Sequence, residues 1–253
     1  MSARLYALKL SHPAHAARLM LERKGIEHEV VNLLPGLHPQ ALRALGFRGK
    51  TVPALKLDDG RRIQGSLQIS AALEELKPDP PLYPPDPEPR RRVIDAERWG
   101  EGVLQDVPRR IFRWGAAGQP EVRRWIAAEI VGVPAPRLAA AVNSPVARRF
   151  ARASDGTDQH VRSDLSKLPD LLERVDELIA DGTIGGAEPN AADLQILASV
   201  RVLSAFPALR AAIGDRPCGR LADRLLPEYP DPIPLEIPSG WVPETMGVGT
   251  LTP

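Results

Sequence analysis

Ser11, His12 and His15 gather a hydroxyl and two imidazole groups at one predicted turn near the N-terminus. They follow an alternating apolar stretch, and Pro13 suits the first position of a helix. Free backbone N–H groups and the positive end of the helix dipole collect at such a start and favour an anion. Ser11 is therefore either a simple N-cap or a donor to a bound anion. The two histidines have no Cys or carboxylate partner at metal-ligand spacing, so we expect no metal site and expect both to face solvent.

Ser66 marks a second helix start that can hold an anion. The run Asp58-Asp59-Gly60 signals a hairpin, and Ser66 follows in a position to cap a helix that runs to about Leu76. A serine hydroxyl, together with the free N–H groups of a first helical turn, can bind a carboxylate.

Four strands and three helices must position these residues. Hydrophobic periodicity predicts the order strand, helix, strand, helix, strand, strand, helix (βαβαββα), with Gly25 as the C-cap of the first helix. The predicted strands are Arg4–Leu10, Glu29–Leu33, Pro53–Leu57 and Arg61–Ile63. The predicted helices are Pro13–Lys24 and Ser66–Leu76, and Pro39–Leu45 is predicted to be a helix or a turn.

The chain of 253 residues suggests two domains, at roughly 100–200 residues per domain. Seven of the thirteen residues from Lys77 to Pro89 are proline, a composition that excludes a helix or a central strand and is typical of a stiff linker. We therefore expect an α/β domain at residues 1–77, a linker at 78–89 and an all-helical domain at 90–226. The helices predicted after the linker are Arg90 to about Trp114, Glu121–Val131, Arg137–Ala151, Val161–Ala180 and Ala191–Ala205, followed by shorter turns to Leu226.

A second proline-rich segment forms the tail at residues 227–253. It mixes its prolines with the apolar residues Ile233, Leu235, Ile237 and Trp241. Disordered tails seldom carry such an apolar content, so we expect an extended segment packed on the body of the protein.

The charge and the cysteine content of the chain limit the partners and the compartment that we expect for this protein. Lys and Arg number 33 against 32 Asp and Glu, so the formal net charge of +1 gives no field that would attract nucleic acid or an anionic membrane. Cys218 is the single cysteine and cannot form an internal disulfide or a CxxC redox pair. No apolar stretch is long enough for a signal sequence or a membrane span. We therefore expect a cytoplasmic protein without nucleic-acid or membrane partners.

Four stretches stand out when they are taken together in chain order. They are the first strand, turn and helix through Lys24-Gly25-Ile26, the run Thr51-Val52-Pro53-Ala54-Leu55, the run Gln64-Gly65-Ser66-Leu67-Gln68-Ile69, and the capping box Asn190-Ala191-Ala192-Asp193. In this order and spacing they resemble the cytosolic glutathione S-transferase superfamily over nearly the whole chain. The resemblance implies a thioredoxin-like N-terminal domain, an all-helical C-terminal domain and a Ser- or Cys-type bacterial member.

The family's glutathione site implies a role for each matching residue. Ser11 stands where the Ser- and Cys-type members contact the sulfur, and Tyr6 is a rival that we expect in the core instead. Val52, before the family's cis-proline Pro53, offers its backbone to the cysteinyl unit. Ser66 binds the glutamyl carboxylate, and His38 aligns with a basic position used for the glycyl carboxylate. Gly65 departs from the acid or amide usual before the serine, and Gln64 is the candidate substitute.

The resemblance also implies an enzyme that uses glutathione as co-substrate to attack a small-molecule electrophile. His12, Trp99, Val103 and Val107 are the candidate electrophile pocket, and a homodimer is expected. Two alternatives stay open, namely a catalytically silent binding or scaffold protein and an enzyme that uses another low-molecular-weight thiol.

Overall fold

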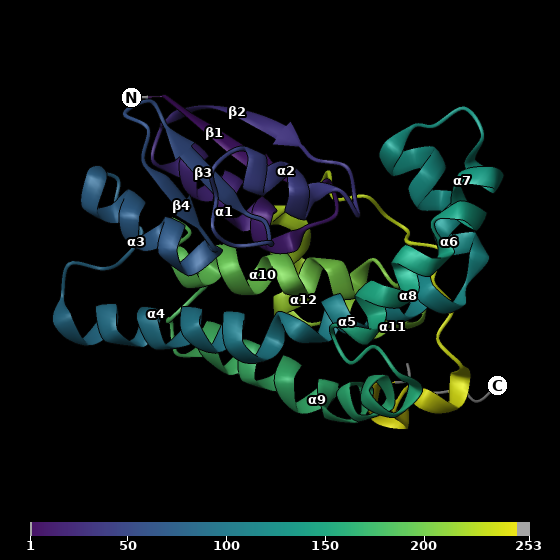
Figure 1. The fold of residues 1–253 in the computed structure, drawn as a ribbon. Coiled ribbons are helices and arrows are strands. Elements are labelled where there is room, and N and C mark those ends of the chain that lie inside the picture. Colours follow the sequence, from purple (N-terminus) through teal and green to yellow (C-terminus); the bar gives the residue numbers. More distant parts are fainter. Residues whose placement is uncertain (1, 247–253) are drawn as a thin grey trace. The chain divides into compact units, whose positions relative to one another are not determined.

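The computed structural model describes residues 2–246 and consists of two compact units (Figure 1). The first unit comprises Met1–Gly102 with Ala180–Ser199, and the second comprises Val103–Ile179 with Val200–Pro253, within the described residues. The all-helical part is therefore divided between the units, because the first unit includes helix α4 (Pro87–Trp99) and most of helix α10 (Ala191–Ser204).

A four-stranded mixed sheet forms the base of the first unit. Its strands lie in the order β2-β1-β3-β4, with β1 parallel to β2 and antiparallel to β3. The chain order β1-α1-β2-α2-β3-β4-α3 confirms the predicted βαβαββα arrangement and its thioredoxin-like class. The strands are β1 (Ser2–Ala7), β2 (Glu27–Asn32), β3 (Ala54–Leu57) and β4 (Arg62–Gln64), and the helices are α1 (His12–Arg23), α2 (His38–Ala44) and α3 (Ser66–Leu76).

The first strand is shorter than predicted. It ends at Ala7 instead of Leu10, because the chain turns there and the Ser11 N–H donates to the Leu8 carbonyl at 2.8 Å. Pro13 lies in the first turn of α1 and Gly25 follows the helix with φ 57°, as the sequence predicts.

Tyr6 belongs to a small apolar cluster of the first unit. Its ring meets Phe47 edge to face at 5.6 Å between centroids, and Leu42 of α2 and Ala54 of β3 complete the buried group. Side chains alternate along a strand, so the neighbouring residue Leu5 points to the opposite face of the sheet, where it is fully buried. The structure thus supports the core position expected for Tyr6.

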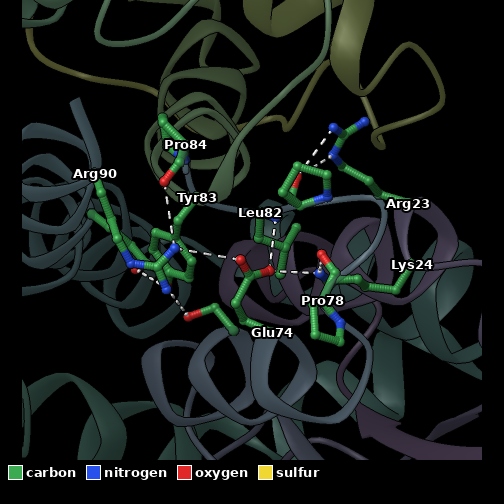
Figure 2. A network of polar contacts seen from close by, with 11 residues as sticks. Arg23, Lys24, Glu74, Pro78, Leu82, Tyr83, Pro84 and Arg90 are labelled. Atoms are coloured by element: carbon green, nitrogen blue, oxygen red, sulfur yellow. Dashed lines mark hydrogen bonds and ion pairs between the residues drawn. The ribbon is translucent and has the colours of Figure 1, made fainter. Parts of the chain in front are cut away.

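The Glu74 carboxylate is a centre of the polar contacts that hold the proline-rich segment after α3 (Figure 2). Lys24, at the end of α1, is fully buried and places Nζ 2.5 Å from Glu74 Oε2. The same oxygen accepts the Leu82 N–H at 2.9 Å, and Arg90 of α4 lies 3.6 Å from the other oxygen. Helix α4 begins at Pro87, three residues before the predicted start, because proline is tolerated in a first turn.

The second unit consists of helices and a non-helical tail segment in the described residues. The predicted helix from Arg90 to Trp114 is instead divided by a π-helical segment, η1 (Gly100–Leu104), and the predicted helix Arg137–Ala151 is broken at Asn143, before Pro145. The remaining elements are α5 (Asp106–Gly118), α6 (Pro120–Trp125), η2 (Ile126–Val131), α7 (Pro136–Val142), α8 (Ser144–Arg152), α9 (Asp158–Ala180), α11 (Pro207–Gly214), α12 (Pro217–Leu225), η3 (Ser239–Trp241) and η4 (Glu244–Met246).

The tail packs along the second unit in its described part, up to residue 246. Ile233 and Leu235 are buried, and the Ile233 N–H donates to the Ala205 carbonyl at 3.0 Å. Gln119 donates to the Glu236 carbonyl at 2.7 Å and accepts the Glu236 N–H at 2.9 Å. The end of the predicted tail, residues 247–253, lies outside the described residues.

No single helix between residues 2 and 246 has both the length and the hydropathy of a membrane span. The segments Pro120–Val131 and Pro136–Val142 reach these criteria only when taken together, and the chain bends by 119° between them.

The predicted capping box at the start of α10 is present. Asn190 Oδ1 accepts the N–H groups of Ala192 and Asp193 at 2.9 and 3.1 Å. The Asp193 carboxylate accepts the N–H groups of Asn190 and Gly185 at 2.9 and 2.7 Å. Asp193 therefore serves stability by joining the preceding loop to the helix.

We predict that Asp193→Ala lowers the free energy of unfolding by about 0.5–2 kcal/mol, because two backbone N–H groups lose their acceptor. Denaturant unfolding of the variant beside Asp95→Ala, an exposed aspartate on α4, measures this effect. Equal stability of the two variants would contradict the role given to Asp193.

Candidate active site

The Ser11 hydroxyl is not used to cap its own helix. Ser11 is the N-cap residue of α1, with φ −79° and ψ 103°, but its side chain makes no capping hydrogen bond. Its backbone carbonyl instead accepts the N–H groups of Ala14 and His15 at 2.9 and 3.0 Å. Few N–H groups are consequently left free at this helix start, since Pro13 has none. The half-buried hydroxyl and the helix dipole are the groups that can stabilise an anion here.

The expectation that both histidines of this turn face solvent is wrong. His12 is buried, because it shares a helix face with Ala16 and Met20, four and eight residues further on, both of which are fully buried. His15 is half-buried, with Nε2 2.8 Å from the Lys9 carbonyl oxygen. Burial lowers the pKa of His15, which favours its neutral form.

Val52 lies shortly before β3, and its side chain packs on the Tyr6 cluster. The Val52–Pro53 peptide bond is cis. No hydrogen bond joins the Val52 backbone to another residue within 2–246, so its N–H and C=O groups can pair with an extended peptide.

Gln64 positions the loop before Val52. Its side-chain Oε1 accepts the Gly49 N–H at 2.8 Å and its Nε2 donates to the Thr51 carbonyl at 2.7 Å. Gly49 is required for this fit, because a Cβ there would lie 2.5 Å from Gln64 Oε1. The Gln64 amide is thus engaged with the loop in this structure.

Gly65 and Ser66 form the start of α3. Gly65 has φ 98° and ψ 144°, and its N–H donates to the Pro53 carbonyl at 3.0 Å. Ser66 is 1% exposed, and its Oγ lies 3.5 Å from Oε1 of Glu101. The first N–H groups of the helix have no acceptor within the helix, so they can bind a carboxylate beside Ser66.

A buried polar chain lies one helical turn along α3 from Ser66. Tyr83 places its hydroxyl 2.9 Å from Ser70 Oγ and 2.7 Å from Oε2 of Glu97. Burial raises the pKa of Glu97 to about 7 and also raises the pKa of Tyr83. A protonated Glu97 can donate to Tyr83, Tyr83 to Ser70, and Ser70 to the Leu67 carbonyl 2.9 Å away, so each hydroxyl proton has an acceptor.

The remaining candidate residues are distributed over both units. His38 is buried at the start of α2, where its N–H donates to the Leu34 carbonyl at 3.1 Å. Trp99 is half-buried in the first unit, whereas in the second unit Val103 is 46% exposed and Val107 is buried. The electrophile pocket therefore stays a prediction.

Sequence reasoning missed Tyr83, Glu97 and Glu101. A signal was present, because Ser66 and Ser70 are four residues apart on one helix, and Glu97 and Glu101 are four apart on the next. Among residues 2–246, no group of three His, Cys, Asp or Glu side chains could hold a metal ion.

Comparison with known proteins finds a family match for the N-terminal part of the chain. Residues 5–81 match the family described as "Glutathione S-transferase, N-terminal domain". This part of the chain is therefore similar to the N-terminal domain of glutathione S-transferases. The chain is 39% identical over 110 residues to the maleylacetoacetate isomerase of Mus musculus and 36% identical over 110 residues to that of Rattus norvegicus. Each match covers 41% of the chain, which spans about half the length of these curated relatives.

Solved structures share the fold over most of the chain. A glutathione S-transferase from Rhodospirillum rubrum F11 is 19% identical, with a TM-score of 0.57, and the match covers 94% of this chain and 97% of that one. A beta-etherase from Sphingobium sp. strain SYK-6 is 19% identical, with a TM-score of 0.59, over 88% of this chain and 99% of that one. The likeness extends through the helical part, which the family match at residues 5–81 does not reach.

We predict that Glu97→Gln makes stability less dependent on pH. The folded pKa of about 7 exceeds the unfolded value of about 4.3, so the folded protein binds more protons between these values. Ionising Glu97 as the pH rises through this window costs roughly 4 kcal/mol in free energy of unfolding. Glutamine keeps the donor to Tyr83 but cannot ionise. The free energy of unfolding of the variant should therefore rise relative to that of the wild type as the pH increases.

Denaturant unfolding between about pH 5 and about pH 8 measures this difference. Glu75→Gln, at an exposed position of α3, is the matched control. The same pH dependence in Glu97→Gln and the wild type would contradict a protonated Glu97.

Proposed function

We propose that this protein is a glutathione-dependent enzyme of the glutathione S-transferase superfamily and of its Ser type, which forms the glutathione thiolate at Ser11 and directs it to a small electrophile. The observation that carries the proposal is the Ser11 hydroxyl at the start of α1, which makes no capping hydrogen bond to its own helix. A serine that served only as an N-cap would be expected to bond to the N–H of the second or third helical residue.

The tripeptide is expected to lie across groups of the first unit. The Val52 backbone pairs with the cysteinyl unit, Ser66 and the start of α3 bind the glutamyl carboxylate, and His38 is the candidate for the glycyl carboxylate. Gln64 supports this arrangement by holding the loop before Val52 and Pro53.

Ser11 acts on the sulfur through a hydrogen bond. Its hydroxyl donates to the sulfur, and the α1 dipole adds a positive potential, so the thiolate is favoured and the proton passes to solvent. Thiol pKa values near helix N-termini fall from about 8.5 to roughly 3.5–7.5. The sulfur electron pair then forms a bond to the electrophilic carbon, and either a leaving group departs or the product takes up a proton.

A second candidate reaction is isomerisation. Its support is the local identity to the two maleylacetoacetate isomerases. In such a reaction the thiolate adds to a conjugated double bond, the resulting single bond rotates, and the thiolate leaves again. It requires the same Ser11 thiolate.

Localisation and assembly are also proposals. A cytoplasmic setting agrees with Cys218, a buried free thiol whose pKa burial raises to about 12. We expect a homodimer, as in the family, and light scattering should give twice the chain mass of 27.5 kDa. A mass of 27.5 kDa in dilute buffer would contradict the dimer.

We predict that Ser11→Ala slows glutathione conjugation at neutral pH about tenfold or more, because a bond to a charged group contributes about 1.5–3 kcal/mol, or roughly one to two pKa units. The rate should partly recover in alkaline buffer, where the thiol ionises unaided. The measurement is the pH–rate profile of the variant, the wild type and Ser166→Ala, at an exposed serine of α9.

An unchanged profile in Ser11→Ala would remove Ser11 from the reaction and favour Tyr6 or His12. A wild-type protein that neither turns over substrate nor binds glutathione would favour the silent scaffold.

A further inference from the structure

Arg113 of α5 differs from the other arginines that the fold covers. Every other buried or half-buried arginine within residues 2–246 has a carboxylate or carbonyl acceptor. Arg110, three residues earlier, donates to the Ser154 carbonyl at 3.1 Å and to the Asp164 carboxylate. The half-buried Arg113 guanidinium has five N–H donors and no hydrogen-bond acceptor among the described residues.

The Arg113 guanidinium lies over the Phe150 ring of α8, with 5.7 Å between Cζ and the ring centroid. This contact attracts the positive charge but supplies no oxygen acceptor for the N–H groups. The Ser154 hydroxyl donates to the Phe150 carbonyl at 3.0 Å, and Arg110 binds the Ser154 carbonyl. The end of α8 is therefore fixed beside α5 by contacts that leave the Arg113 donors unused.

Arg109 adds a second positive charge to the same face of α5, because it lies four residues before Arg113. Arg109 is paired with Asp106 at 2.7 Å. Burial and then the repulsion from Arg109 lower the pKa of Arg113 to about 10, and the opposing attraction to Asp106 is weaker. Water can hydrate the Arg113 donors, but an anion would also offset the repulsion between the two guanidinium groups.

The chemistry around Arg113 suits a small organic acid. A guanidinium group binds a carboxylate through two parallel hydrogen bonds, which gives both charge and geometric fit. Val146, one turn before Phe150 on α8, is 39% exposed. Because residues four apart share a helix face, Val146 offers apolar surface near the arginine for the body of such a ligand.

We propose that Arg113, assisted by Arg109, binds the carboxylate of a small organic acid with an apolar body at the contact between α5 and α8. All the residues of this site belong to the second unit. The inference therefore goes beyond the proposed function and does not depend on glutathione.

The test uses benzoate as the probe and benzamide, its neutral counterpart, as the matched control compound. Isothermal titration of the full-length wild type should give saturable binding of benzoate, about tenfold or more tighter than that of benzamide, because the amide lacks the charge. Arg113→Gln should weaken benzoate binding about tenfold or more, and Arg113→Lys should retain part of the affinity because it keeps the charge without the fork. Arg149→Gln, at an exposed arginine of α8 with no ion pair within residues 2–246, should bind benzoate as the wild type does.

Three results would overturn this site. Equal affinity of the wild type for benzoate and benzamide would do so without any variant. A wild type that does not bind benzoate would do so as well. Benzoate affinity that is undiminished in a folded Arg113→Gln protein would remove Arg113 from the site.

Discussion

The Glu74 carboxylate joins the elements on which the candidate site depends. Lys24 follows the end of α1, and Glu74 lies near the end of α3, so their buried ion pair joins the C-terminal ends of two helices whose N-termini carry Ser11 and Ser66 (Figure 2). The same carboxylate accepts the Leu82 N–H and thereby holds the proline-rich segment that leads to α4. Removing one partner of a buried pair leaves an uncompensated charge and typically costs about 3–5 kcal/mol, so this contact couples folding to the geometry of the site.

The N-termini of α1 and α3 offer different hydrogen-bonding groups to a ligand. At the first, most N–H groups are bonded to the Ser11 carbonyl or absent at Pro13, so the hydroxyl is the main hydrogen-bond donor available to an anion. At the second, Ser66 adds its hydroxyl to unused N–H groups, which suits a carboxylate. Burial raises the pKa of Glu97, one helical turn before Glu101, to about 7, which favours its protonated form. The start of α1 thus suits a thiolate, and the start of α3 suits the carboxylate of a ligand.

Local signals made most of the N-terminal fold predictable. Pro13 and Gly25 delimit α1, the Asp58-Asp59-Gly60 run turns the hairpin, and the capping box starts α10, all through contacts within a few residues. The site was only partly predictable. The Ser66–Glu101 approach joins residues 35 positions apart, and the close approach of Gly100 to Ile196 joins residues of two distant helical segments. Such contacts arise from tertiary structure and leave no periodic trace in one sequence.

We propose that this protein holds glutathione as its thiolate. The most direct measurement is a pH titration of the thiolate absorbance of glutathione bound to the wild-type protein. We expect a bound-thiol pKa below about 7.5, against about 8.5 for an unperturbed thiol. A bound thiol that titrates like the free one would contradict activation at Ser11, whatever the affinity for glutathione.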